Sequence, residues 1–99
     1  MSQFDVHQLS SGSPLVINCQ ADLLQHLNTR LVVPLMEMGQ APKAAHRLNP
    51  VFTIGGREHV MVTQFAAAVQ LSELGDFVIS LRDRSFDVVN ALDVLISGV

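Results

Sequence analysis

The spacing of the apolar residues changes near residue 83, and this change restricts the folds that the chain can adopt. Up to about residue 80, apolar side chains come in short runs separated by turn-forming residues, which is typical of strands. Beyond it they recur at i, i+1, i+4, i+7 and i+8, the spacing of one helical face. We therefore expect several strands and then one terminal helix, with Asp83 as its N-cap. The helical face consists of Val88, Val89, Leu92, Leu95 and Ile96.

Paired glycines mark the clearest hairpin. Gly55 and Gly56 lie between the strand-like segments 51–54 and 58–62, and adjacent glycines supply the positive φ that tight hairpin turns require. A second hairpin, with a longer loop over residues 10–14, is predicted to join strands at 4–9 and 15–19. Short antiparallel connections without β-α-β alternation favour a mainly β (α+β) fold, in which the helix packs on a small, strongly bent sheet or barrel.

A further strand is predicted at residues 31–35, where Pro34 interrupts an apolar run. Proline has no N–H to donate to a neighbouring strand. We therefore expect Pro34 at an edge, a bulge or a strand end, and not in a central strand. The weaker patterns are a helical turn or an irregular loop at 21–28, a helical turn or bend at 64–68, and short strands at 69–71 and 77–79.

Length and composition indicate one domain that associates with protein. At 99 residues the chain is long enough for one core and too short for two, so we expect a single domain over residues 1–99. Hydrophobic residues make up 48% and charged residues 15%, which excludes a disordered chain and favours a homodimer. The net charge is −3 with a single lysine and scattered arginines, so direct nucleic-acid binding by the isolated chain is not expected.

The sequence also bears on cellular location. Cys19 is the only cysteine and cannot form an internal disulfide, and residues 1–5 lack the charged and apolar regions of a signal peptide. No apolar run approaches the roughly 20 residues that a membrane-spanning helix needs. We expect a soluble cytoplasmic protein that does not associate with membranes.

No pattern selects a metal, a cofactor or a catalytic site. The histidines lack close ligand spacing and the lone cysteine adds no pair, so surface or packing roles are favoured over zinc binding. There is no Gly-x-Ser-x-Gly elbow, and the paired glycines lack the following lysine of a phosphate-binding loop. We expect a binding protein without a cofactor rather than an enzyme. The four histidines are His7, His26, His46 and His59.

The predicted helix continues almost to the last residue, without a polar tail. Its apolar stripe is most simply explained as core, but Gly98 and Val99 lie beyond the last full turn. Chain ends are poorly ordered unless they are tied down. We expect this apolar end either to close the fold or to be recognised by a partner.

Taken together, these segments resemble the CcdB family of toxins from toxin–antitoxin modules. The similarity spans essentially the whole chain and rests on the order and spacing of several segments. The resemblance implies an SH3-like β-barrel with a C-terminal α-helix, a homodimer, and a toxin that binds the DNA gyrase A subunit and traps the cleaved-DNA complex. The segments are residues 3–6, 20–24, 30–35, 48–55, 61–63 and 90–99.

The resemblance also implies which residues bind gyrase. In the family this contact is made by the C-terminal residues, supported by an apolar pair near the end of the second strand. The best-known members carry tryptophan where this chain has Ser97, and losing such an aromatic anchor costs about 2 kcal/mol of binding or more. Asp93 replaces a neutral asparagine. Carried over by position, the site is Leu23, Leu24, Asp93, Ile96, Ser97, Gly98 and Val99, with no catalytic residue.

The partner implied by the family is a CcdA-like antitoxin, whose disordered segment wraps the toxin and displaces it from gyrase. The complex represses its own operon, with the DNA contacts made by the antitoxin, and such modules serve plasmid maintenance. Two alternatives stay open. One is an mRNA-cleaving endoribonuclease toxin of the same fold, which needs basic and acid–base residues gathered on one face. The other is a non-toxic relative that keeps antitoxin binding and has lost toxicity through Ser97.

Overall fold

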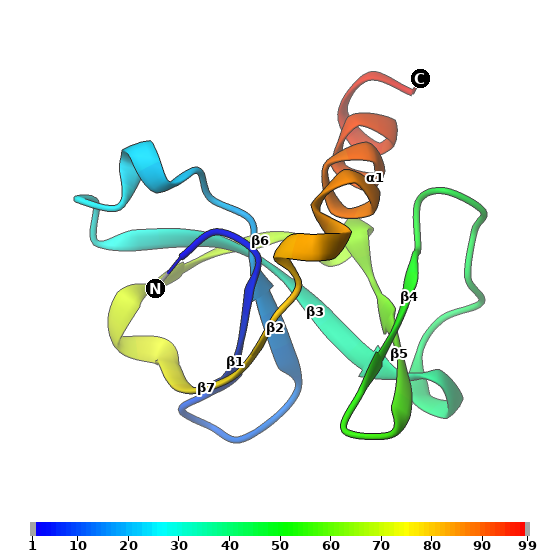
Figure 1. Cartoon of the computed structure of the whole chain (residues 1–99), viewed down its shortest axis with the longest axis horizontal. Coiled ribbons are helices and arrows are strands. Elements are labelled where there is room, and N and C mark those ends of the chain that lie inside the picture. Colours follow the sequence, from blue (N-terminus) through cyan, green and yellow to red (C-terminus); the bar gives the residue numbers. More distant parts are fainter. Residues whose placement is uncertain (1, 99) are drawn as a thin grey trace.

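In the computed structural model, which describes residues 2–98, an antiparallel sheet curls into a half-barrel and a single α-helix rises from one side of it (Figure 1). The mainly β, α+β prediction of a small barrel with a C-terminal helix is confirmed. The strands are β1 (Asp5–Leu9), β2 (Leu15–Asn18), β3 (Thr29–Glu37), β4 (Val51–Ile54), β5 (Arg57–Met61), β6 (Ala67–Gln70) and β7 (Leu74–Ser80), and the helix is α1 (Ser85–Ser97).

The long strand β3 organises the sheet, whose order is β4-β5-β3-β2-β1-β7 with β6 also paired to β3. One long side of β3 pairs with β2, and the other is shared between two partners. Residues 29–32 pair with β6 and residues 35–37 with β5. Because consecutive parts of one strand follow different neighbours, the sheet bends at this point. The strands predicted at 69–71 and 77–79 correspond to β6 and β7. The first pairs with β3 and the second with β1.

The paired-glycine hairpin is confirmed. Ile54 lies opposite Arg57, which leaves Gly55 and Gly56 as a two-residue turn between β4 and β5. Their φ angles are +60° and +79°. Positive φ at both central positions is the requirement of a type I′ turn, whose twist matches that of the flanking strands.

The expectation that Pro34 avoids a central strand is wrong. Pro34 lies within β3 and faces Val16 of β2. Its carbonyl accepts a hydrogen bond from the Val62 N–H at 3.0 Å, so its missing N–H points toward the same neighbour. The Val62 carbonyl instead accepts the Phe65 N–H at 2.9 Å, in the 3₁₀ turn η3 (Thr63–Phe65) between β5 and β6. The turn thus satisfies the acceptor that proline leaves open, and a central position becomes acceptable.

The main core lies inside the curl of the sheet, under the first half of α1. Cys19 belongs to it and is buried, as a small apolar residue would be. Burial raises the pKa of the Cys19 thiol to about 12, so the thiol stays protonated near neutral pH. The largest apolar side chains of this core are Phe4, Ile17, Leu35, Phe52 and Met61, which meet Val88 and Ala91 of the helix.

The start of the helix differs from the prediction. Asp83 lies inside a 3₁₀ turn, η5 (Arg82–Arg84), and α1 begins only at Ser85. The N-cap residue is therefore Arg84, without a side-chain capping bond, and the prediction of Asp83 as N-cap is wrong. The periodic pattern does not distinguish a 3₁₀ turn from the first turn of an α-helix, and for that reason it placed the boundary too early.

The apolar stripe of the helix is core only in part. Val88 and Ala91 are buried and Leu92 packs partly against the core, whereas Ile96 is 80% exposed. Val89 and Leu95 are also exposed, so the prediction that all five stripe residues form core is wrong. Figure 1 shows that α1 stands on the sheet with its first turns and extends beyond it, so its second half has no core beneath it. Val89 lies in the first half and is exposed because it points away from the side of Val88 and Ala91.

Candidate protein-binding surface

Two neighbours fix the orientation of α1. Val88 and Ala91 point into the core, and Asn90 accepts a 3.4 Å hydrogen bond from Arg47 in the loop before β4. At 100° per residue, the side of the helix opposite Val88 and Ala91 faces away from the core. We call this side the outer face of α1; it carries Phe86, Val89, Asp93, Ile96 and Ser97.

The predicted helix residues differ in what they offer a partner. Ile96 is an apolar side chain in solvent, and Asp93 is exposed with no hydrogen bond or ion pair to its carboxylate among the described residues. Ser97 donates its hydroxyl hydrogen to the Asp93 backbone carbonyl at 2.7 Å, so its polar group is used within the helix. Gly98 has a φ of +73° and ends the helix through a 2.9 Å bond from its N–H to the Val94 carbonyl. Val99 lies outside the described residues.

The predicted apolar pair occupies the loop between β2 and β3. A 3₁₀ turn, η1 (Asp22–Leu24), contains both residues, and Leu23 is 85% exposed while Leu24 is partly covered. The Asp22 carboxylate accepts the Gln3 backbone N–H at 2.8 Å. The Gln20 side chain donates to the Leu24 carbonyl at 3.0 Å and accepts the Leu31 N–H at 3.1 Å. The exposed leucines are therefore presented on a fixed turn.

A buried arginine holds the second half of this loop. Arg30 is only 5% exposed, and its guanidinium donates to the carbonyls of Leu27 at 2.7 Å, Thr29 at 2.8 Å and Gln25 at 2.9 Å. No carboxylate forms an ion pair with it among the described residues. The planar, multiply donating guanidinium suits this task because it can bridge several carbonyls at once. A loop held in this way loses little conformational entropy on binding.

The structure places the two halves of the predicted site on one side of the sheet without joining them. Arg82 contacts Asp22 at 3.7 Å, which ties η1 to the segment just before α1. In Figure 1, η1 and the far end of the helix rise from the same side of the molecule, with a clear separation between them. The η1 turn is thus tied to the segment that precedes α1, whereas the far end of the helix lies apart from it.

Two residues of the outer face, Phe86 and Val89, are absent from the sequence-based site, and Phe86 is the more exposed. Phe86, in the first turn of α1, is 82% exposed. The helical stripe excluded it because it is out of phase with the core residues. Its relation to Asp93 and Ser97, at i+7 and i+11, is the signal that would have identified it.

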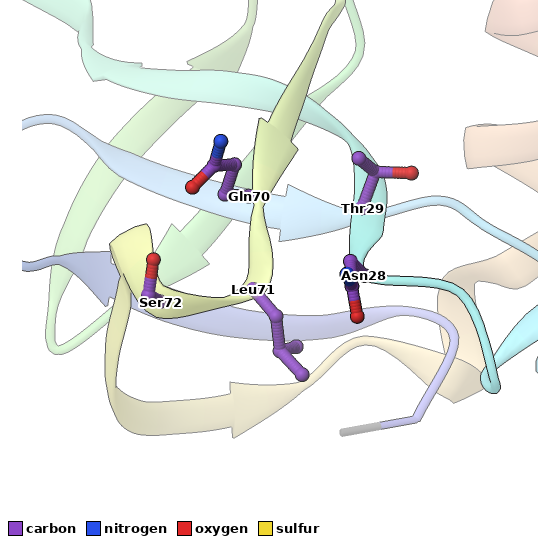
Figure 2. Close-up of a pocket in the computed structure, with 5 residues that line it drawn as sticks. All are labelled: Asn28, Thr29, Gln70, Leu71 and Ser72. Atoms are coloured by element: carbon purple, nitrogen blue, oxygen red, sulfur yellow. The ribbon is translucent and has the colours of Figure 1, made fainter.

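Two cavities lie near the strands and the helix. One, of about 670 Å³, lies where β3 begins and β6 ends, and Figure 2 shows its lining of Asn28, Thr29, Gln70, Leu71 and Ser72. None of these side chains titrates near neutral pH. A second cavity of about 530 Å³ lies between α1 and the loop before β4. There Arg84 is already bound to Asp87 at 2.7 Å and lies 4.7 Å from the ring centroid of Phe52.

Histidines and arginines are mostly occupied by structural contacts. The ring of buried His7 is 3.1 Å from the Gly75 carbonyl, and that of buried His59 is 3.1 Å from the Arg57 carbonyl. Arg57 pairs with Glu37 at 3.0 Å. Over residues 2–98 no three histidine, cysteine or acidic side chains gather as metal ligands would, and no helix is long and apolar enough to cross a membrane. The described surface offers exposed apolar side chains, on η1 and on the outer face of α1, for contact with another protein.

The family model described as CcdB protein matches residues 3–98, which is nearly the whole chain. The match includes the η1 loop, the outer face of α1 and every strand of the sheet. The resemblance noted from the sequence is confirmed.

Proposed function

Since the chain belongs to the CcdB family of toxins from toxin–antitoxin modules, we propose that it acts by binding the DNA gyrase A subunit and trapping the cleaved-DNA complex. One observation carries this proposal: the second half of α1 extends beyond its own core, with Ile96 80% exposed. An apolar helix end that the chain does not bury is free for a protein partner. Such an inhibitor acts by binding alone and is not an enzyme.

Five of the predicted site residues have a defined role in this proposal. Leu23 and Leu24 provide apolar contact from a fixed turn, and Ile96 provides it from the helix. Asp93 offers a negative charge to the partner, while Gly98 lets the backbone turn after the last helical residue. Exposed apolar side chains that need no rearrangement before binding favour affinity. The proposed contact set is Leu23, Leu24, Asp93, Ile96, Ser97, Gly98 and Val99.

The active form in this proposal is a homodimer. Exposed apolar residues also occur away from α1, among them Phe65 in η3 and Leu71 after β6. Large apolar side chains in solvent are typical of surfaces that a partner covers. A two-fold symmetric dimer presents two copies of α1 and so matches a two-fold symmetric target.

A CcdA-like antitoxin completes the proposed module in the cytoplasm. Its disordered segment would cover the same apolar surface and release gyrase, and the complex would repress the operon. The net charge of −3 supports a division of labour in which the antitoxin contacts DNA. The pairing of Arg57, Arg82 and Arg84 with carboxylates supports the same division and disfavours an RNA-cleaving toxin.

Ser97 supports one second candidate, a relative that binds antitoxin but no longer poisons gyrase. Its hydroxyl bonds to the backbone of its own helix and supplies no anchor to a partner. The test uses purified gyrase and supercoiled plasmid, with supercoiling and cleaved DNA measured over a range of protein concentrations. Accumulating cleaved complexes would support the poison, whereas none at saturating protein, with antitoxin binding retained, would favour the second candidate. Degradation of added mRNA without gyrase would point to a nuclease.

Induced expression in cells provides an independent test of the target. The protein is expressed in cells with wild-type gyrase and in cells with a toxin-resistant gyrase A subunit. Killing confined to the first strain is expected. Equal killing in both strains would exclude gyrase as the target.

A further inference from the structure

Phe86 is the most exposed aromatic residue among those that the structure describes. It is 82% exposed, compared with 52% for Phe65 and 56% for Phe77. Its two chain neighbours are less exposed, since Ser85 is half-buried and Asp87 binds Arg84. A phenylalanine ring in water on the first turn of a helix adds nothing to the core, and polar or acidic residues suit that position better. Folding therefore does not account for this side chain.

Helix geometry aligns Phe86 with the predicted binding residues. Ser97 follows it by eleven residues, close to three full turns, so the two side chains lie on nearly one line along the helix. Asp93 lies on the same line, about 10 Å from Phe86 along the axis. Val89 and Ile96 flank this line on one side. The outer face of α1 is therefore one continuous strip that begins at Phe86 and reaches the predicted site.

Phe86 lies at the end of α1 that is nearer to η1, which carries the other half of the predicted site. The 3.7 Å contact of Arg82 with Asp22 holds η1 beside the segment that leads into the first turn of α1. Phe86 belongs to this first turn, whereas Ile96 lies near the far end of the helix. An apolar surface that includes Phe86 and Val89 extends from the far end of α1 toward the side of the molecule that carries the leucine pair.

The charge on this strip indicates the chemistry of its partner. Asp93 is its single charged residue, and its carboxylate has no ionic partner among the described residues. A matching partner surface carries a cationic side chain opposite Asp93 and apolar groups, or the face of a guanidinium, against the Phe86 ring. Phenylalanine is enriched at protein interfaces relative to the rest of the protein surface.

We propose that Phe86 is the aromatic anchor of this surface, with Val89 beside it, and that the gyrase A subunit meets it with a basic, otherwise apolar patch. This inference rests on the proposed gyrase binding. It moves the aromatic contact from the position of Ser97 to the first turn of the helix. Recognition then involves the whole length of α1 and not its end alone.

The test compares two exposed phenylalanines in the full-length protein. Phe86→Ala is the test variant and Phe77→Ala is the matched control, because Phe77 is also exposed but lies on β7, outside the outer face. Affinity for purified gyrase A subunit is measured by calorimetry at low and moderate salt, together with thermal unfolding and the oligomeric state of each variant. We expect Phe86→Ala to weaken binding at least tenfold without changing unfolding or oligomeric state, and Phe77→Ala to bind like the wild type. Asp93→Asn is expected to reduce the salt dependence of binding.

The outcomes separate this inference from the proposed function. If the wild type binds gyrase and Phe86→Ala binds equally well, the anchor is disproved and gyrase binding stands. If the wild type shows no binding, the proposed function fails and the inference falls with it. A change of oligomeric state in Phe86→Ala would assign the strip to contact between copies of this chain, which also overturns the proposal.

Discussion

Replacing Arg30 with methionine tests whether a fixed η1 loop matters for binding. The buried guanidinium makes three hydrogen bonds to the carbonyls of Gln25, Leu27 and Thr29. Hydrogen bonds to charged groups contribute roughly 1.5–3 kcal/mol each, but the freed carbonyls belong to exposed residues and regain water. Methionine also removes the cost of burying a charge. We therefore expect a net loss of about 2 kcal/mol in the free energy of unfolding, or roughly 10 °C in Tm.

The larger effect is expected in the loop itself. Without the guanidinium, residues 22–29 gain conformational freedom, and ordering them again on binding costs affinity beyond the loss of stability. Urea unfolding measures the first effect, and amide hydrogen exchange of the loop with gyrase binding measures the second. Arg57→Met is the control, because the Arg57–Glu37 pair is exposed and such pairs contribute little. Unchanged exchange in residues 22–29 of Arg30→Met would refute the reasoning.

Three further predictions concern the helix, its end and the thiol. Val88→Ala leaves a cavity in the core and should cost about 2 kcal/mol of stability, whereas Val89→Ala on the outer face should change the urea midpoint little but weaken gyrase binding. Cys19 in the native protein should resist alkylation from pH 7 to 9 and react only when urea unfolds it. Burial raises the pKa of its thiol from 9.0 to about 12. The contribution of the thiol to the free energy of unfolding is present below pH 9 and is lost as pH rises toward 12. Fast alkylation of the folded protein at pH 8 would contradict this prediction. Deleting Gly98 and Val99 should abolish toxicity, while the circular dichroism spectrum stays near native and the dimer stays intact. An unfolded deletion variant would instead show that these two residues are needed for folding.

Local signals in the sequence identified much of the fold. The paired glycines predicted the β4–β5 turn because glycine adopts positive φ without steric cost, whatever its tertiary surroundings. Pro34 was misjudged for the opposite reason. Whether a missing N–H matters depends on the carbonyl that it would have bonded on the neighbouring strand. Here that carbonyl belongs to Val62 and accepts the Phe65 N–H in η3, a turn that the local pattern around Pro34 does not reveal.

The helix illustrates a second limit of periodicity. The spacing from Val88 to Ile96 established which residues share a face, but not how far the neighbouring sheet extends beneath them. The exposed half of α1 and the ring of Phe86 became apparent only with the three-dimensional arrangement. The predicted gyrase contacts came from family resemblance, and the structure adds how the η1 loop is held.

The support of α1 along only its first half has a consequence for divergence among relatives. Substitutions at Val88 or Ala91 must satisfy the packing of the core before they can be tolerated. Those on the outer face, such as the serine at position 97, leave the folded state almost unchanged, and only the partner detects them. A family built in this way can exchange one target surface or antitoxin for another by altering a few exposed positions, while its barrel and stability are inherited intact.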